Sequence, residues 1–220
     1  MSKLSEDLVL AGRYAGRVAL RLRRLVSGGD PSAVVVPVPE AEPLVSMWRS
    51  RFDASAAQGM PAHITILYPF LRGRSLTDDA VAQLKRLCAR QPALDVVFRR
   101  TARFPNVLYL EPDPADGLRT LTDDLAVHWP QAPPYGGEFD EIIPHLTVAQ
   151  DIGDRVLDAV DAMLSPSLPF ATRLDHALLL VYDGTRWRER ARLPFAYGLT
   201  GSSRARKSEV KAQARAAGSG

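Results

Sequence analysis

The sequence has one cysteine and no long apolar run, and each shortage excludes a class of protein. Cys88 has no second cysteine with which to form a disulfide or a zinc cluster. No stretch of about 20 uninterrupted apolar residues occurs, and the N-terminus lacks the apolar core and cleavage site of a secretory signal. We therefore expect a soluble cytoplasmic protein without stable membrane insertion, structural disulfides or structural zinc.

The body of the chain has no excess of positive charge, although the 220 residues together carry a net charge of +3. Residues 1–30 have six basic and three acidic side chains, and residues 200–220 have five and one. The segment between them is therefore net negative. A broad nucleic-acid-binding face on the body is not expected, because such faces need clustered Lys and Arg. Any site for a polyanion there must be local.

The charge distribution divides the chain into three parts. Apolar residues from Leu4 to Leu25 recur at spacings of four and three, so residues 1–30 are predicted to be a basic amphipathic helical extension. This helix is expected to pack on the body, while pairing with a second copy or lying on an anionic membrane surface remain open. Residues 200–220 are polar, basic and rich in Gly and Ser, which predicts a disordered tail. Residues 31–199 form the predicted folded domain.

The body alternates short apolar strands with amphipathic helices. Strands are predicted at 32–39, 62–70, 94–100, 106–112 and 142–150, with two or three more between 170 and 195. Helices are predicted at 44–52, 76–90, 115–129 and 152–163, and a loop at 130–140. The second half of this series echoes the first. The pattern therefore predicts an α+β protein of two lobes that share a groove.

The two echoing strands carry the same short motif, a histidine followed two positions later by a threonine. The motifs are His63-Ile64-Thr65-Ile66 and His145-Leu146-Thr147-Val148. Side chains alternate along a strand, so each strand would bury its aliphatic pair and present an imidazole and a hydroxyl on the other face. If the lobes face one another, two imidazoles and two hydroxyls converge.

This quartet matches the chemistry of phosphodiester cleavage. One group must take a proton from the attacking oxygen while another gives a proton to the leaving oxygen, and two histidines meet both needs near neutral pH. The hydroxyls of Thr65 and Thr147 can donate hydrogen bonds to the phosphate oxygens. No metal or cofactor is required. The alternatives are two structural histidines or two metal ligands, and neither strand has a further ligand at close spacing.

Further aromatic and basic residues are candidates for contact with substrate. Tyr68 follows the first motif and could stack on a base or pack in the core, and Tyr135 and Phe139 of the 130–140 loop could also stack on a base. Arg186, Arg188, Arg190 and Arg192 alternate along a predicted strand, so all four are expected to share one face. Arg188 and Arg192 are the candidates to reach a bound phosphate, while a solvated outer face is the alternative.

The paired motifs resemble those of the 2H phosphoesterase superfamily, in its 2′-5′ RNA ligase and cyclic phosphodiesterase branch. The resemblance rests on HITILYPF at 63–70 and PHLTVAQ at 144–150, with support from 103–112 and 191–195. It implies a bilobal, pseudo-two-fold α+β fold of two antiparallel-rich sheets, with helices outside and a central cleft. It also implies that His63 and His145 are the acid and base, and that Thr65 and Thr147 bind phosphate.

The resemblance implies a metal-independent phosphodiesterase without a cofactor. Its substrates would be 2′,3′-cyclic phosphate RNA ends, oligonucleotides or small cyclic or 2′-5′-linked nucleotides, with reverse 2′-5′ ligation as a further activity. A non-catalytic module that binds RNA ends in the same cleft is the first alternative. The second is an interaction protein that acts through the basic helix at residues 1–30.

Overall fold

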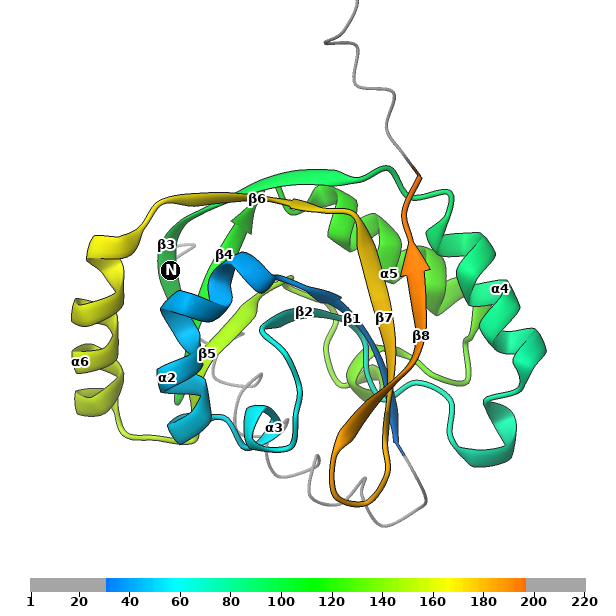
Figure 1. Ribbon diagram of the computed structural model, residues 1–220, viewed down its shortest axis with the longest axis horizontal. Helices are drawn as coiled ribbons and strands as arrows, with labels where there is room; N and C mark the ends of the chain where they lie inside the picture. The colour runs from blue at the N-terminus through cyan, green and yellow to red at the C-terminus, as the bar shows by residue number, and fades with distance from the viewer. Residues whose placement is uncertain (1–30, 197–220) are drawn as a thin grey trace, which may run out of the picture.

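Eight strands and their covering helices make up the described part of the chain, residues 31–196 of a computed structural model (Figure 1). The strands are β1 (Ser32–Pro37), β2 (His63–Leu67), β3 (Leu94–Phe104), β4 (Val107–Asp113), β5 (Leu146–Gln150), β6 (Phe170–Leu174), β7 (His176–Tyr182) and β8 (Trp187–Pro194). The α-helices are α2 (Glu42–Phe52), α3 (Ala54–Ala57), α4 (Asp78–Cys88), α5 (Asp116–His128) and α6 (Asp154–Leu164). Short 3-10 helices are η2 (Pro39–Ala41), η3 (Gly73–Ser75), η4 (Pro134–Gly137) and η5 (Ser165–Ser167). The helix predicted for residues 1–30 and the tail predicted for 200–220 lie outside the described residues.

All eight strands belong to one antiparallel sheet, which curls into a half-barrel (Figure 1). Their order is β6-β3-β4-β5-β2-β1-β7-β8, so two groups of four strands meet where β2 pairs with β5. The residue pair at this junction is Ile64 opposite Leu146. The two predicted lobes are thus the two halves of a continuous sheet, and the two predicted histidine strands are its central pair.

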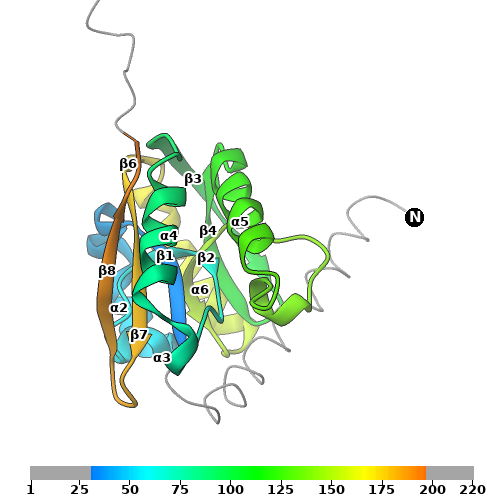
Figure 2. The same ribbon diagram turned by 90° about the vertical axis from the view of Figure 1, so that its right-hand side faces the viewer.

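The order of helices and strands repeats across the junction. The series β1-α2-β2-α4 is followed by β4-α5-β5-α6, and each half sends its first helix across to the other: α2 packs against β5, and α5 packs against β2. Helices α4 and α5 lie side by side (Figure 2), as do α2 and α6 (Figure 1). The predicted α+β class and pseudo-two-fold arrangement are therefore confirmed.

Alternation along the central strands separates the core from the opposite face of the sheet. Ile64 and Ile66 of β2, with Leu146 and Val148 of β5, are buried in the main core beneath the helices. Burial of each such side chain contributes about 1.5–3 kcal/mol to folding. The histidines and threonines between them are half-buried on the other face. The predicted division into an aliphatic and a polar face is confirmed.

Helix α4 shows how the sequence fixes a covering helix. The Thr77 side chain accepts a hydrogen bond from the Ala80 backbone N–H and caps the first turn. Val81, Leu84 and Cys88 then lie on one buried face. Burial raises the pKa of the Cys88 thiol to about 12, so the thiol stays protonated at neutral pH. Cys88 is a core residue, as predicted.

Two sequence predictions fail locally, and a third is refined. The strand predicted at 142–150 begins only at Leu146, because Pro144 has no N–H to pair with a neighbouring strand. The segment predicted as a loop at 130–140 is irregular, as expected: Tyr135 and Gly136 within η4 have left-handed, non-helical backbone angles. In β8 the register against β7 shifts at a bulge, with Leu179 opposite Ala191 and Leu180 opposite Glu189. This extra residue reverses the side-chain alternation, so the prediction that four arginines share one face is wrong.

Candidate active site

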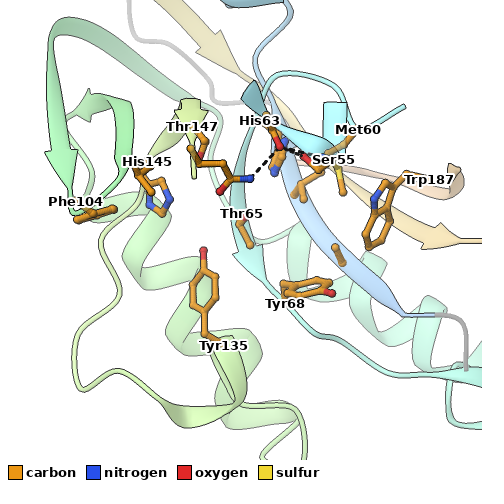
Figure 3. Close-up of a pocket in the computed structure, with 15 residues that line it drawn as sticks. Ser55, Met60, His63, Thr65, Tyr68, Phe104, Tyr135, His145, Thr147 and Trp187 are labelled. Atoms are coloured by element: carbon orange, nitrogen blue, oxygen red, sulfur yellow. Dashed lines mark hydrogen bonds between the residues drawn. The ribbon is translucent and has the colours of Figure 1, made fainter. Parts of the chain in front are cut away.

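The two histidine motifs line one pocket on the face of the sheet away from the main core (Figure 3). Counting outward from the Ile64–Leu146 pair sets His63 beside Thr147 and Thr65 beside His145. Each imidazole therefore has a threonine of the other half as its cross-strand neighbour. The two histidines lie on a diagonal of this group, and in a regular ladder such diagonal neighbours are about 7–8 Å apart.

Both imidazoles are held by the same local hydrogen bond. Nδ1 of His63 lies 2.7 Å from the carbonyl oxygen of Pro61, and Nδ1 of His145 lies 2.7 Å from that of Ile143. A carbonyl oxygen only accepts, so Nδ1 carries the proton and donates in each case. In the neutral ring Nε2 then keeps its lone pair. The two histidines are matched in tautomer and in the way each ring is fixed.

The surroundings disfavour a positive charge on either ring. Burial and the nearby Arg49 guanidinium lower the pKa of His63 to about 4, outweighing the Pro61 hydrogen bond and Asp53. His145 contributes a further lowering of the same pKa. Burial also lowers the pKa of His145, against the opposing effect of its Ile143 hydrogen bond. Both imidazoles are therefore neutral at pH 7 before an anion binds.

Apolar and aromatic side chains form the walls around the histidines. On the β1 side the wall consists of Ala33, Val35, Met60, Tyr68 and Trp187. The rings of Tyr68 and Trp187 meet edge to face, with centroids 6.1 Å apart. On the opposite side Phe104 lies edge-on to the His145 ring at 5.1 Å, and Tyr135 projects from η4 (Figure 3). Such walls suit a planar, largely apolar group attached to a phosphate.

Polar side chains complete the lining beside His63. They are Asp53, Ser55 and Gln150, and behind them Arg49 forms a buried ion pair with Asp53 at 3.0 Å, each side chain only 2% exposed. Sequence reasoning missed all four residues. An Asp directly before a helix is a recognisable N-cap signal, and Asp53 does cap α3. Its contact with Gln150 joins residues far apart in the sequence and has no local signature.

Most of the predicted site residues come together in this pocket. His63, Thr65, Tyr68, His145 and Thr147 all line it, and so does Tyr135. Phe139 packs edge to face on Tyr135, with centroids 5.7 Å apart, and is not part of the lining.

The two arginine candidates lie outside the pocket. Arg188 is exposed and donates to Asp183 at 2.8 Å. Arg192 lies opposite Leu178 on β7 and contacts Nδ1 of His176 at 3.3 Å. The structure therefore places neither guanidinium among the groups that would meet a phosphate held between the histidines.

Within residues 31–196 no group of three His, Cys, Asp or Glu side chains is arranged to hold a metal ion. Over the same residues, none of the helices has the length and apolar character needed to cross a membrane.

Comparison with known proteins matches this architecture to one family. A family model described as the 2′-5′ RNA ligase superfamily matches residues 36–186. A protein of Geobacillus kaustophilus (strain HTA426), named "Putative phosphoesterase GK0864", is 24% identical over 152 residues, which cover 67% of this chain and 84% of its own. Its counterpart in Geobacillus thermodenitrificans (strain NG80-2) is 25% identical over 151 residues, with the same coverage.

Solved structures show the same fold. The crystal structure of Escherichia coli LigT in its apo form aligns with a TM-score of 0.50 at 19% identity, covering 76% of this chain and 98% of that one. The crystal structure of TT0787 of Thermus thermophilus also aligns with a TM-score of 0.50, at 17% identity, covering 76% and 99%.

Proposed function

The chain belongs to the 2′-5′ RNA ligase superfamily, and from that premise we propose that it is a metal-independent phosphodiesterase with two catalytic histidines. Membership confirms the resemblance expected from the paired motifs and supports an enzyme of the phosphoesterase type. The proposed substrates are 2′,3′-cyclic phosphate RNA ends and small cyclic or 2′-5′-linked nucleotides. One observation carries the proposal: two imidazoles, each fixed through Nδ1, line one pocket with a threonine of the opposite half beside each.

Opening of a cyclic phosphate needs two proton transfers, which the histidines divide. The neutral imidazole takes a proton from water through Nε2 while the water oxygen attacks phosphorus. The other imidazole, as imidazolium, gives its Nε2 proton to the ribose oxygen as the phosphorus–oxygen bond breaks. The products are a phosphomonoester and a free hydroxyl. Each histidine has then exchanged its protonation state with the other.

The bound substrate supplies the charge that favours a cationic imidazole. Both imidazoles are neutral at pH 7, so one must gain a proton before it can act as an acid. A phosphodiester carries one negative charge, and an anion beside an imidazole raises its pKa. The hydroxyls of Thr65 and Thr147 donate to the non-bridging oxygens as charge develops on them.

The same arrangement accommodates a 2′-5′ linkage. The neighbouring 3′-hydroxyl attacks phosphorus and loses its proton to one histidine, while the other histidine protonates the departing 5′-oxygen. This step yields a 2′,3′-cyclic phosphate and a 5′-hydroxyl. Its reverse joins those two ends, which is the proposed ligation.

Replacement of either histidine tests the proposal. Purified full-length protein, with EDTA present, is incubated with 2′,3′-cyclic mononucleotides and 2′-5′-linked dinucleotides. We expect His63→Ala and His145→Ala each to lower turnover about 10²–10⁴-fold, the usual contribution of a general acid or base. His128→Ala is the matched control, because His128 lies exposed at the end of α5, contacts the Asp124 carbonyl and the Trp129 ring, and does not line the pocket.

The outcomes separate the candidate functions. Product from the wild type and from His128→Ala, but not from the two pocket variants, supports two-histidine catalysis. Turnover that survives both pocket substitutions contradicts it. Nucleotide binding by the wild type without product, measured by calorimetry on the same panel, would favour the RNA-end-binding module instead.

A further inference from the structure

The carboxylate of Asp53 joins three elements around the pocket. It lies at the end of α2 and caps the start of α3, and its side chain is 2% exposed. Its Oδ2 accepts two hydrogen bonds from Arg49, at 3.1 and 3.0 Å. Its Oδ1 accepts from the Ser55 backbone N–H and hydroxyl, at 3.0 and 2.7 Å, and from Nε2 of Gln150 on β5, at 3.1 Å.

The same group of residues clamps the backbone just before His63. Arg49 also donates to the carbonyl of Met60, at 3.2 Å, and Glu42 accepts from the N–H of Ala62, at 2.6 Å. Pro61 lies between these two bonds, and its carbonyl is the one that orients the His63 ring. A shift of Asp53 or Arg49 would therefore move the acceptor that fixes His63.

Gln150 extends this link to the second motif. It is the last residue of β5, the strand that starts directly after His145. Through Gln150 the carboxylate of Asp53 connects the segment that orients His63 to the strand that carries Thr147. This bond joins a side chain between α2 and α3, which belong to the first half of the fold, to a side chain of β5 in the second half.

We propose that Asp53 is a positioning residue, which with Arg49 and Gln150 holds the His63 segment in register with the His145 strand. This inference rests on the proposed two-histidine chemistry and adds the group that aligns it. Misplacement of a catalytic group by about 1 Å costs about 100-fold in rate, so the link has a measurable effect on turnover.

The two charged groups of this network have opposite effects on the pKa of His63. Arg49 approaches from α2 and lowers the pKa of His63, Asp53 at the joint of α2 and α3 raises it, and His145 across the pocket lowers it. Glu42 at the start of α2 lies 4.0 Å from Arg49. Neither Arg49 nor Asp53 is among the causes that shift the pKa of His145. The ion pair therefore acts on one histidine of the two.

Imidazole titration by NMR gives a readout that structural damage alone would not produce. Asp53→Asn keeps the helix cap and removes the negative charge, so the pKa of His63 should fall below that of the wild type. Arg49→Met/Asp53→Asn removes both charges, and because Arg49 has the larger effect, the pKa should rise above that of the wild type. The pKa of His145 should stay unchanged in both. Signals are assigned with His63→Gln and His145→Gln.

Turnover of a 2′,3′-cyclic mononucleotide tests the positioning itself. Gln150→Met keeps the side-chain length and leaves the buried ion pair intact, but removes the bond to Asp53. We expect kcat to fall about 10-fold while KM changes less than about twofold, because the two histidines, the two threonines and the aromatic walls of the pocket remain. Gln91→Met is the matched control: Gln91 is a buried glutamine that donates to the Pro92 carbonyl away from the pocket.

The inference is overturned if Gln150→Met has the kcat of the wild type, or if both charge variants shift the pKa of His63 in the same direction. The titration needs no substrate. A wild type that converts none of the nucleotides would therefore refute the proposed function, while the NMR result would still decide whether the ion pair sets the protonation of His63. If Asp53→Asn does not fold, the double variant and Gln150→Met carry the decision.

Discussion

The two histidines have matched hydrogen bonds but unmatched surroundings. Each donates from Nδ1 to a carbonyl two residues earlier in the chain. Only His63 has a buried ion pair among the groups that shift its pKa. Since an acid and a base must differ in protonation, this asymmetry matters for the pH at which the pair can work.

We expect kcat/KM to be highest on the acid side of neutrality. One histidine must be neutral and the other cationic, and the pKa of His63 is about 4 while that of His145 lies below its ordinary 6.5. The productive, singly protonated form of the free enzyme is therefore most populated below pH 6.5. Above that range kcat/KM should fall about tenfold per pH unit as the cationic histidine loses its proton.

Initial rates at subsaturating and saturating substrate from pH 4 to 9 check this expectation. The alkaline limb of kcat should lie at higher pH than that of kcat/KM, because the bound phosphate raises the pKa of the acid. A maximum of kcat/KM above pH 8 would contradict it.

At this scale the sequence predicts the catalytic candidates better than their support. Each histidine–threonine motif lies within one short segment, so it can be recognised without knowledge of the tertiary fold. Alternation within these segments is enough to identify His63, Thr65, His145 and Thr147. Asp53 and Gln150 meet only after α2 has crossed to β5, so their contact depends on the tertiary fold. The sequence does predict that Trp187 faces away from Arg186 and Arg188, because successive side chains along a strand point to opposite faces.

Among the secondary-structure elements around the pocket, η4 has the least regular backbone. Tyr135 has a positive φ of 51°, and its N–H donates to the Tyr68 carbonyl at 2.6 Å. This bond attaches the 130–140 segment to the end of β2, and the Tyr135 ring then projects toward the pocket (Figure 3). The prolines and glycines that predict a loop do not reveal this contact.

Tyr135→Ala should raise KM about tenfold and leave kcat within a few-fold, because loss of an aromatic wall weakens stacking without touching the proton transfers. Steady-state kinetics on a 2′,3′-cyclic purine nucleotide measures both constants. Phe139→Ala serves as the comparison, because Phe139 contacts the Tyr135 ring but does not line the pocket. An unchanged KM in Tyr135→Ala would show that the ring makes no contact with the nucleotide.

The helices and strands are predicted well wherever a full amphipathic period is present. Helices α4, α5 and α6 occur close to their expected positions because their apolar residues recur at helical spacing. The β8 bulge was missed because a single inserted residue leaves no mark in a stretch of alternating arginines. Its effect is large, since Trp187 packs on the pocket side while Ala191 and Leu193 pack in the main core.

For the whole molecule, the junction between β2 and β5 decides whether the halves unfold together. The sheet is continuous across it, and one apolar cluster includes residues of both halves and of α2, α4, α5 and α6. We therefore expect a single cooperative unfolding transition despite the two-fold arrangement.

Leu146→Ala tests this expectation at the junction. Leu146 is fully buried opposite Ile64, so its truncation should lower the free energy of unfolding by about 2–5 kcal/mol. Urea denaturation followed by both fluorescence and circular dichroism should still give coincident curves. Separate transitions for the two probes would mean that the halves are independent units.

The register of β8 has a consequence for the behaviour of the protein in concentrated solution. This strand stands at the end of the sheet, with β7 as its neighbour. A row of unpaired backbone groups invites another chain to add a strand, and charged side chains oppose such edge-to-edge aggregation. Arg188, Glu189, Arg190 and Arg192 are all exposed there, and the bulge distributes their charges over both faces. Within residues 31–196, the arginines that were candidates to bind a phosphate therefore supply charge along an edge strand.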